Sequence, residues 1–439
     1  MEGQLRAIIR QKIVDSLAML PRAFTRRDVY LPQVENKAIA VIGMRRAGKT
    51  TFLWQVLADR LAAGTPREGL VYFSFEDERL AGMSQIHLGL VLEEYYSLHP
   101  EWREGRKATF FLDEIQVIPG WEQFARRLLD TEEVDLFLSG SSARLLSREV
   151  ATAMRGRGME AHVHPFSFRE FLRHIGREPV VAPDRLGKAA RSALSRDLRE
   201  YLVSGGFPEA VGVAKRDRSS LLTSYVDVVL LRDVIDRYNV TNPTALRAMT
   251  RQLLANAAGA FSVSKLVGAL HSQGVAVAKD TLHGYLAHLE DAFLLRTVPI
   301  DAGSERKRMV NLRKIYPVDP GLIPLFDRSG RANLGHALET CVLHDLEQRG
   351  WEVAYVRTRS GFEVDFVARQ PGRQPELIQV TAGIPDAEVR RRELRALVEA
   401  QEMYPDASRH LVIIEPGDMG TIPSGVGVHS AVDWLLRSE

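Results

Sequence analysis

The sequence lacks the features of exported, disulfide-stapled and membrane-spanning proteins. It contains one cysteine, Cys341, which excludes an internal disulfide and a zinc site built from several thiolates. No run approaches the roughly 18 consecutive apolar residues that a membrane helix needs, and the first residues lack the apolar core of a secretory signal. We therefore expect a cytoplasmic protein with no membrane partner.

A strong excess of charge of either sign is also missing. Lysine and arginine number 58 against 56 acidic residues, which gives a net charge of +2. This balance makes no case for a nucleic-acid partner by itself, so any basic surface must come from local clustering. The 439 residues exceed the roughly 250–300 residues of a single core, so several domains are expected.

The stretch G-M-R-R-A-G-K-T at positions 43–50 has the spacing of a P-loop. An apolar run, KAIAVIG, leads into it and an amphipathic run, TTFLWQVLADRLA, follows, so a strand, a tight turn and a helix N-terminus would aim backbone N–H groups at phosphates. Lys49 should reach the β and γ phosphates of ATP, and Thr50 should bind Mg²⁺ through its hydroxyl. The predicted nucleotide-binding residues are Gly43, Arg45, Arg46, Ala47, Gly48, Lys49, Thr50 and Thr51.

An Asp-Glu pair at the end of the apolar run TFFL supplies the second half of a metal site. Asp113 fits the carboxylate on the Mg²⁺ side, and Glu114 fits the group that orients or deprotonates the attacking water. Five strand-like runs that alternate with helical runs predict a parallel sheet with covered faces.

The additional strand between the P-loop and this pair resembles the catalytic-glutamate class of ATPases. In that class a polar residue at the tip of the following strand senses the γ-phosphate, which implies Ser139. Ser141 and Ser142 are rivals, although both could instead cap the next helix.

Longer blocks, among them LDEIQVIPGWEQFARRLLD and YLVSGGFPEAV, resemble prokaryotic AAA-type ATPases, often called archaeal-type ATPases. The resemblance runs nearly end to end. It implies an α/β fold with a P-loop AAA-type core, a helical lid, a winged helix-turn-helix and a nuclease-like α/β end. We predict an N-terminal helical segment at 1–35, the core at 36–180, the lid at 181–245, the winged helix at 246–312 and the nuclease-like domain at 313–439.

Two further elements take their roles from this resemblance. Arg155 and Arg157, in AMRGRGMEA, fall where oligomeric AAA ATPases extend an arginine to the γ-phosphate of a neighbouring subunit, and Arg157 is the preferred candidate. The alternative is a solvated turn whose arginines pair with surface acids. GGFPEA resembles a glycine-x-proline element that places Pro208 beside the adenine.

The run FSVSKLVGALHSQGVAVAKDTLHGYLAHLEDAFLLRTVPI has the pattern of a winged helix-turn-helix whose second helix begins at Lys279. Such a module binds DNA or another protein. A basic cluster follows it and could neutralise DNA phosphates. The alternative is a run of solvated surface charges with no binding role. The candidate DNA contacts are Lys279, Arg306, Lys307, Arg308, Arg313 and Lys314.

The last segment resembles the PD-(D/E)XK nuclease fold, which gathers a helix carboxylate, a strand Asp and an acid-x-lysine pair around Mg²⁺. Glu339 and Asp365 match the first two, and Gln379 can stand for the acid. Thr381 occupies the lysine position and cannot supply its positive charge. We therefore expect a degenerate nuclease-like site that is used for binding.

Together these patterns predict a Mg²⁺-dependent ATPase that assembles as a homo-oligomer, with a hexamer as the candidate assembly. Its expected partner is duplex or branched DNA, which it would bind and remodel. Two alternatives stay open: a signalling switch in which ATP exposes a surface for a protein partner, and a nuclease whose cutting ATP regulates.

Overall fold

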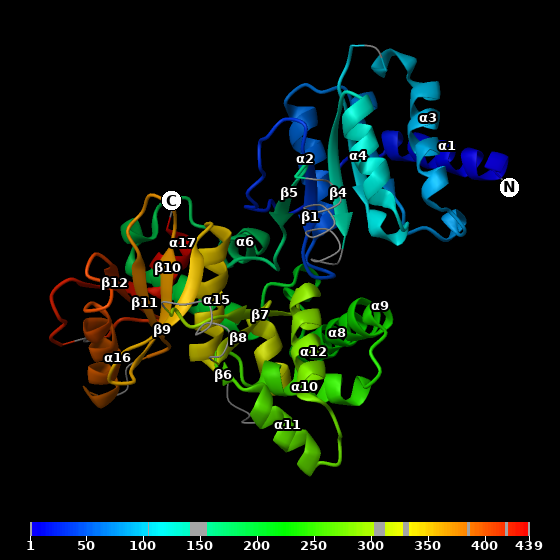
Figure 1. Ribbon diagram of the computed structural model, residues 1–439. Coiled ribbons are helices and arrows are strands. Elements are labelled where there is room, and N and C mark those ends of the chain that lie inside the picture. Colours follow the sequence, from blue (N-terminus) through cyan, green and yellow to red (C-terminus); the bar gives the residue numbers. More distant parts are fainter. Residues whose placement is uncertain are drawn as a thin grey trace. The chain divides into compact units, whose positions relative to one another are not determined.

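The computed structural model describes residues 2–103, 105–140, 156–302, 312–327, 333–383, 387–417 and 420–437. It divides into two compact units, Met1–His164 and Pro165–Glu439, which we call the first and the second unit (Figure 1). Both units combine helices with a sheet, so the predicted α/β fold class is confirmed.

The first unit is built on a parallel five-stranded sheet. Its strands are β1 (Ala38–Ile42), β2 (Leu70–Ser74), β3 (Ala108–Asp113), β4 (Val134–Gly140) and β5 (Gly158–His162), in the order β2-β3-β4-β1-β5. Every residue of β1 and β3 is buried, as expected for strands with both faces covered. The strand β4 lies between the P-loop strand β1 and the acidic-pair strand β3.

Helices accompany this sheet. They are α1 (Glu2–Ala18), α2 (Lys49–Ala62), α3 (Gly89–Leu98) and α4 (Trp121–Thr131). In α4 the buried side chains include Trp121, Phe124 and Leu128, which recur at the three- and four-residue spacing of one helix face. The N-terminal helix α1 packs against β2 and α3 and buries Ile9 and Ile13.

The second unit begins with a helical part. It contains α6 (Phe168–His174), α7 (Lys188–Ser204), α8 (Lys215–Val228), a π-helical segment (Val229–Ile235) and α9 (Asp236–Tyr238). A smaller motif follows with α10 (Pro243–Ala255), β6 (Ala260–Phe261), α11 (Val263–Ser272), α12 (Lys279–Asp291), β7 (Leu295–Val298) and β8 (Arg313–Pro317). Its antiparallel strands lie in the order β6-β8-β7.

A mixed sheet forms the last part of the second unit. Its order is β13-β12-β11-β10-β9, and its strands are β9 (Glu352–Arg357), β10 (Glu363–Arg369), β11 (Glu376–Thr381), β12 (Ser408–Ile413) and β13 (Val426–Ser430). The strands β9, β10 and β11 run antiparallel, whereas β12 and β13 are parallel to β11. The helices α15 (Leu334–Gln348), α16 (Ala387–Ala400) and α17 (Ala431–Leu436) pack against this sheet, whereas α14 (Ile323–Phe326) packs against α10.

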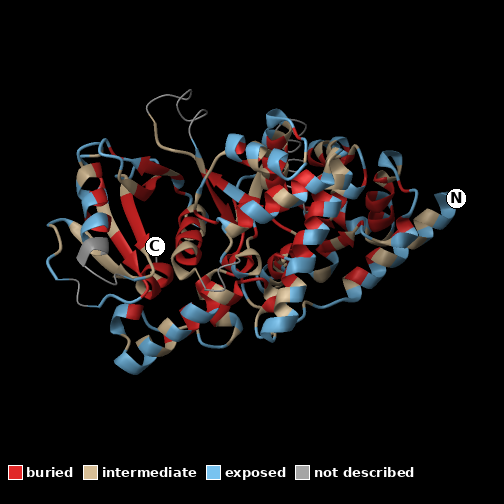
Figure 2. Cartoon of the chain, turned by 90° about the horizontal axis from the view of Figure 1, so that it is seen from below, coloured by how far each residue is buried: buried red, intermediate tan, exposed pale blue. Residues whose placement is uncertain are grey.

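Alternation along these strands gives the sheet two apolar faces. Phe366 and Ile378 join the core that contains residues of α15, whereas Val367 and Leu377 join the core that contains residues of α16. Buried residues, red in Figure 2, accordingly run along the strands, and the exposed positions lie mainly on helices and loops. The sheet is therefore a fixed frame on which polar side chains at strand ends can be placed.

The structure divides the chain differently from two of the predicted domain boundaries. The predicted core extended to residue 180, but α6 packs with α7 and α17 in the second unit. The predicted winged helix ended at 312, but β8 pairs with both β6 and β7 and completes their sheet. The finer division into lid, winged helix and nuclease-like domain stays a prediction. None of the described helices is long and apolar enough to cross a membrane.

Candidate nucleotide site and carboxylate pocket

The loop between β1 and α2 has the backbone that a phosphate cradle requires. Gly43 and Gly48 adopt positive φ angles of 151° and 101°, and Gly48 immediately precedes the first residue of α2. A Cβ atom on Gly43 would lie 2.1 Å from the carbonyl oxygen of Val163, so the loop passes too close to the end of β5 for any side chain. The predicted strand, turn and helix are thus all present.

Lys49 lies at the start of α2, with its ammonium turned into the loop. It is 6% exposed, and its Nζ donates a hydrogen bond of 3.1 Å to the carbonyl oxygen of Met44. A lysine held this way lies over the place where a phosphate would meet the loop N–H groups and the positive end of the helix. Of the other predicted contacts, Ala47 is buried, whereas Arg46 and Thr51 are exposed.

The sequence did not predict the role of Arg27, which fixes the loop by hydrogen bonds. The guanidinium of Arg27, from the segment between α1 and β1, donates hydrogen bonds to the carbonyl oxygens of Ala47 (2.9 Å) and His164. Gln55 of α2 fixes the backbone of Arg27 by accepting from its N–H (2.7 Å) and donating to its carbonyl oxygen (3.1 Å). No spacing rule ties a residue 20 positions upstream to the loop, so only the tertiary structure reveals this role.

Asp113 stands at the centre of the metal side of the site. Its Oδ2 accepts hydrogen bonds from the hydroxyl of Thr50 (2.9 Å) and from the phenol of Tyr72 (2.6 Å), and its Oδ1 accepts one from Ser139. The structure thus brings Thr50, Asp113 and Ser139 together. Tyr72, on the neighbouring strand β2, was not expected, because an apolar strand sequence does not show which tyrosine reaches its neighbour.

Glu114 follows in a left-handed conformation, with φ of 54°, which turns the chain sharply at the end of β3. Its N–H donates a 3.1 Å hydrogen bond to the Ser139 hydroxyl, and its carboxylate accepts one from Gln116. Burial raises the pKa of Glu114 above its ordinary value, although Lys49, Gln116 and Arg45 oppose the shift. A desolvated carboxylate with a raised pKa suits a group that accepts a proton.

The donors at this position suit Mg²⁺ better than a transition metal. Thr50 and Asp113 offer oxygen ligands only, and they already lie within hydrogen-bond distance. Among the described residues, no group of three or more His, Cys, Asp or Glu is arranged to hold a metal.

The predicted transition-state residues are only partly described. Arg157 directly precedes β5, is half-exposed, and pairs with Asp130 of α4. Arg155, like the rival sensors Ser141 and Ser142, lies outside the described residues. Contact of Arg157 with the γ-phosphate of a neighbouring subunit therefore stays a prediction, and the Asp130 pair is the kind of contact that the alternative of a solvated turn predicts.

Pro208 and the GGFPEA turn belong to the second unit, where the turn has a local anchor. The buried carboxylate of Asp319 accepts hydrogen bonds from the N–H groups of Gly206 (2.7 Å) and Gly321 (2.9 Å). Burial raises the pKa of Asp319 to about 7, and the two backbone donors only partly offset this shift. Contact between Pro208 and adenine stays a prediction.

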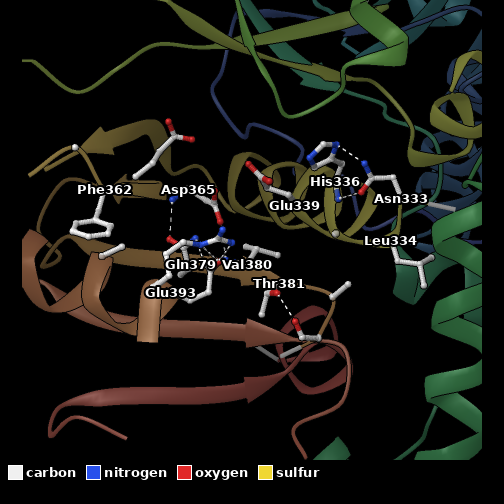
Figure 3. Close-up of a pocket in the computed structure, with 17 residues that line it drawn as sticks. Asn333, Leu334, His336, Glu339, Phe362, Asp365, Gln379, Val380, Thr381 and Glu393 are labelled. Carbon is white, nitrogen blue, oxygen red and sulfur yellow. Dashed lines mark hydrogen bonds and ion pairs between the residues drawn. The ribbon is translucent and has the colours of Figure 1, made fainter. Parts of the chain in front are cut away.

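In the second unit, a pocket of about 760 Å³ lies where the nuclease-like site was expected. Figure 3 shows Glu339 of α15 beside Asp365 of β10, with Gln379 and Thr381 on the adjacent strand β11. The first three predicted residues thus share one pocket. Thr381 also lines it, but its hydroxyl donates to the carbonyl oxygen of Gly383 (3.0 Å).

One predicted DNA contact is wrong. Lys314 is 3% exposed, and its ammonium lies 2.9–3.0 Å from carboxylate oxygens of Glu339, Glu363 and Asp365. A buried, ion-paired lysine cannot contact a DNA backbone. Lys279 is exposed at the start of α12, Arg313 is half-buried on β8, and Arg306, Lys307 and Arg308 lie outside the described residues.

Comparison with known proteins agrees with this geometry. Residues 35–172 match the family described as AAA domain, and residues 195–330 match a domain of unknown function, DUF8612. An uncharacterized protein of Methanocaldococcus jannaschii is 29% identical over 94% of this chain and 90% of its own, and one of Haemophilus influenzae is 29% identical over 95% and 100%.

Among solved structures, the Walker-type ATPase PABY2304 of Pyrococcus abyssi aligns with 73% of this chain and 95% of its own, at a TM-score of 0.41 and 14% identity. The family match, which spans the whole parallel sheet, decides the assignment together with the loop and the Asp113 cluster. The first unit therefore has the fold of an AAA-type P-loop ATPase core.

Proposed function

We propose that this chain is a Mg²⁺-dependent ATPase that acts as a homo-oligomer and uses ATP to bind and remodel DNA. One observation carries the ATPase part: Lys49, Thr50, Asp113 and Glu114 gather where β1 and β3 end, as ATP hydrolysis requires. The AAA domain match over residues 35–172 supports the same activity.

The chemistry follows from the positions of these side chains. Bound Mg²⁺ would neutralise phosphate charge, with Thr50 and Asp113 as its protein-side ligands. Lys49 would leave the Met44 carbonyl to meet the β and γ phosphates, and Glu114 would orient the attacking water and accept its proton. Ser139 bridges the Asp113 carboxylate and the Glu114 backbone, so it couples the metal side to the base.

Arg157 supports an oligomeric form of the enzyme, with a hexamer as the candidate. It is half-exposed on the first unit and precedes β5, so it can reach a second chain if it leaves Asp130. An arginine supplied between chains would make turnover depend on assembly. Mixing inactive Arg157→Ala with inactive Lys49→Ala should restore activity, since each chain supplies what the other lacks; no recovery at any ratio would contradict an arginine shared between chains.

The second unit supports the choice of DNA as partner. Its helices α10, α11 and α12 and the strand order β6-β8-β7 support the prediction of a winged helix-turn-helix. The exposed Lys279 begins the candidate recognition helix, and the link from β7 to β8 carries the basic cluster Arg306, Lys307 and Arg308 in its sequence. The preference for branched over duplex DNA rests on the nuclease-like resemblance, which is an analogy of fold.

DNA binding is tested with single-stranded, duplex, forked and four-way DNA in a mobility-shift panel. We expect binding that weakens steeply with salt, because each phosphate contact adds about 0.9 to the slope of log affinity against log salt. Lys279→Glu should weaken binding, whereas Lys265→Glu on α11 serves as the matched control. If the wild type binds none of these DNA forms, the signalling switch is favoured instead.

A further inference from the structure

Lys314 has an unusual environment for a lysine. It is 3% exposed, and three carboxylates surround it, with Nζ to oxygen distances of 3.0 Å to Glu339, 2.9 Å to Glu363 and 2.9 Å to Asp365. An ammonium has three N–H groups and accepts no hydrogen bond. Its Nζ donates hydrogen bonds to Glu339 and Asp365 and forms an ion pair with Glu363, so the three carboxylates hold the ammonium in place.

This lysine reaches the carboxylates from a different sheet. It lies on β8, which pairs with β6 and β7, whereas Asp365 lies on β10 and Glu339 on α15. Thr381, the position where a nuclease of this fold would carry its lysine, is turned to Gly383. The structure thus supplies from β8 the positive charge that β11 lacks.

Both carboxylate oxygens of Asp365, Oε1 of Glu339 and the side-chain oxygen of Gln379 have partners within the protein. Asp365 Oδ2 accepts the N–H of Val380 (2.9 Å), and Glu339 Oε1 also accepts the hydroxyl of Tyr316 (2.6 Å). The amide of Gln379 donates to Glu393 (2.6 Å), and its oxygen accepts the N–H of Asp365 (3.3 Å). The predicted ligands are held by one another and by Lys314.

Lys314 is buried among these carboxylates and does not line the pocket. Glu339, Glu363 and Asp365 line the pocket, but Lys314 is not among its lining residues. A lysine that activates a water molecule must face the substrate and keep a donor for it. Lys314 does not line the pocket, and three carboxylates hold its ammonium, so its position fits a fixed counter-ion.

We propose that Lys314 takes the place of the divalent cation in this pocket, and that the second unit therefore binds no metal there and cuts no DNA. This inference rests on the nuclease-like part of the proposed function. It accounts for the acidic side chains without any metal, since their positive partner is built into the chain.

The direct test is the binding of Mn²⁺ alone, without nucleotide or DNA, measured by electron paramagnetic resonance. Lys314→Ala removes the built-in cation, so this variant should bind one more Mn²⁺ per chain than the wild type. Its lowered melting temperature should rise on adding Mn²⁺ by more than that of the wild type. Lys265→Ala, which removes an exposed lysine of α11 outside the carboxylate cluster, is the control and should behave as the wild type.

A Lys314→Ala variant that gains no Mn²⁺ would overturn the proposal. If this variant does not fold, Lys314→Met keeps the volume of the side chain, and the wild type can be compared with Asp365→Asn. Equal Mn²⁺ binding by the wild type and Asp365→Asn supports the proposal. Mn²⁺ binding or Mg²⁺-dependent DNA cleavage that the wild type shows and Asp365→Asn loses would overturn it, whatever the outcome for ATP turnover and DNA binding.

Discussion

Replacing Glu114 with glutamine separates binding of ATP from its hydrolysis. Glutamine has the same shape, and the hydrogen bond between the residue-114 N–H and Ser139 involves only the backbone at that position. The oxygen of the new amide can still accept from Gln116, so no buried donor loses its partner. We therefore expect folding and ATP affinity to change little.

The effect on turnover should be large. Loss of a general base typically costs a factor of about 10²–10⁴, which is roughly 2.7–5.5 kcal/mol in the activation barrier. The wild type should also lose kcat/KM on the acid side at a pH above the ordinary range of a glutamate, because burial raises the pKa of Glu114 and protonation removes the base. In Glu114→Gln this acid limb should disappear.

A phosphate-release assay across pH, together with binding of a fluorescent ATP analogue, measures both quantities. Glu133→Gln changes an exposed glutamate near the start of β4 and serves as the control, with turnover expected to match the wild type. Full turnover by Glu114→Gln, or an equal loss of ATP binding and turnover, would refute the assignment of this residue as the base.

The other expectations concern the geometry around the site and the second unit. Gly43→Ala should abolish ATP binding, seen by isothermal titration, because its Cβ would lie 2.1 Å from the Val163 oxygen; normal binding would contradict the close approach. Tyr72→Phe removes a 2.6 Å hydrogen bond to Asp113 and should make the binding free energy of Mg²⁺-ATP less favourable by about 1.5–3 kcal/mol. An unchanged Mg²⁺ dependence of turnover would disprove this. Asp319→Asn leaves one of two backbone amides without an acceptor and should cost about 1–3 kcal/mol in unfolding free energy by denaturant titration. Because burial raises the pKa of Asp319 to about 7, its stabilising effect is full at low pH and is lost as pH rises through 7, so the deficit of the variant should shrink over that range; a growing deficit would contradict this sign.

The nucleotide site was largely predictable because its parts are local. The loop, Lys49 and Thr50 are contiguous, and the end of a buried strand places Asp113 at the same edge of the parallel sheet. The residues that complete the site, Arg27 and Tyr72, were not predictable. Each acts through a side chain brought in from another element, and no periodicity in the sequence encodes that contact.

Lys314 shows the same limit more sharply. In the sequence it belongs to a basic run, and charge clustering alone placed it on a DNA-binding surface. The strand β8 instead turns it inward, where burial raises the cost of a charge unless partners compensate it, and Glu339, Glu363 and Asp365 do so. Which face of a short strand is buried depends on the neighbouring sheet, and that information lies elsewhere in the chain.

The most direct test of the central claim is DNA affinity measured against nucleotide state. Fluorescence anisotropy with labelled duplex and four-way DNA should give different affinities with and without a non-hydrolysable ATP analogue and Mg²⁺, and Lys49→Ala should remove that difference. Identical DNA affinity in every nucleotide state, in a protein that hydrolyses ATP, would contradict the coupling of ATP to DNA.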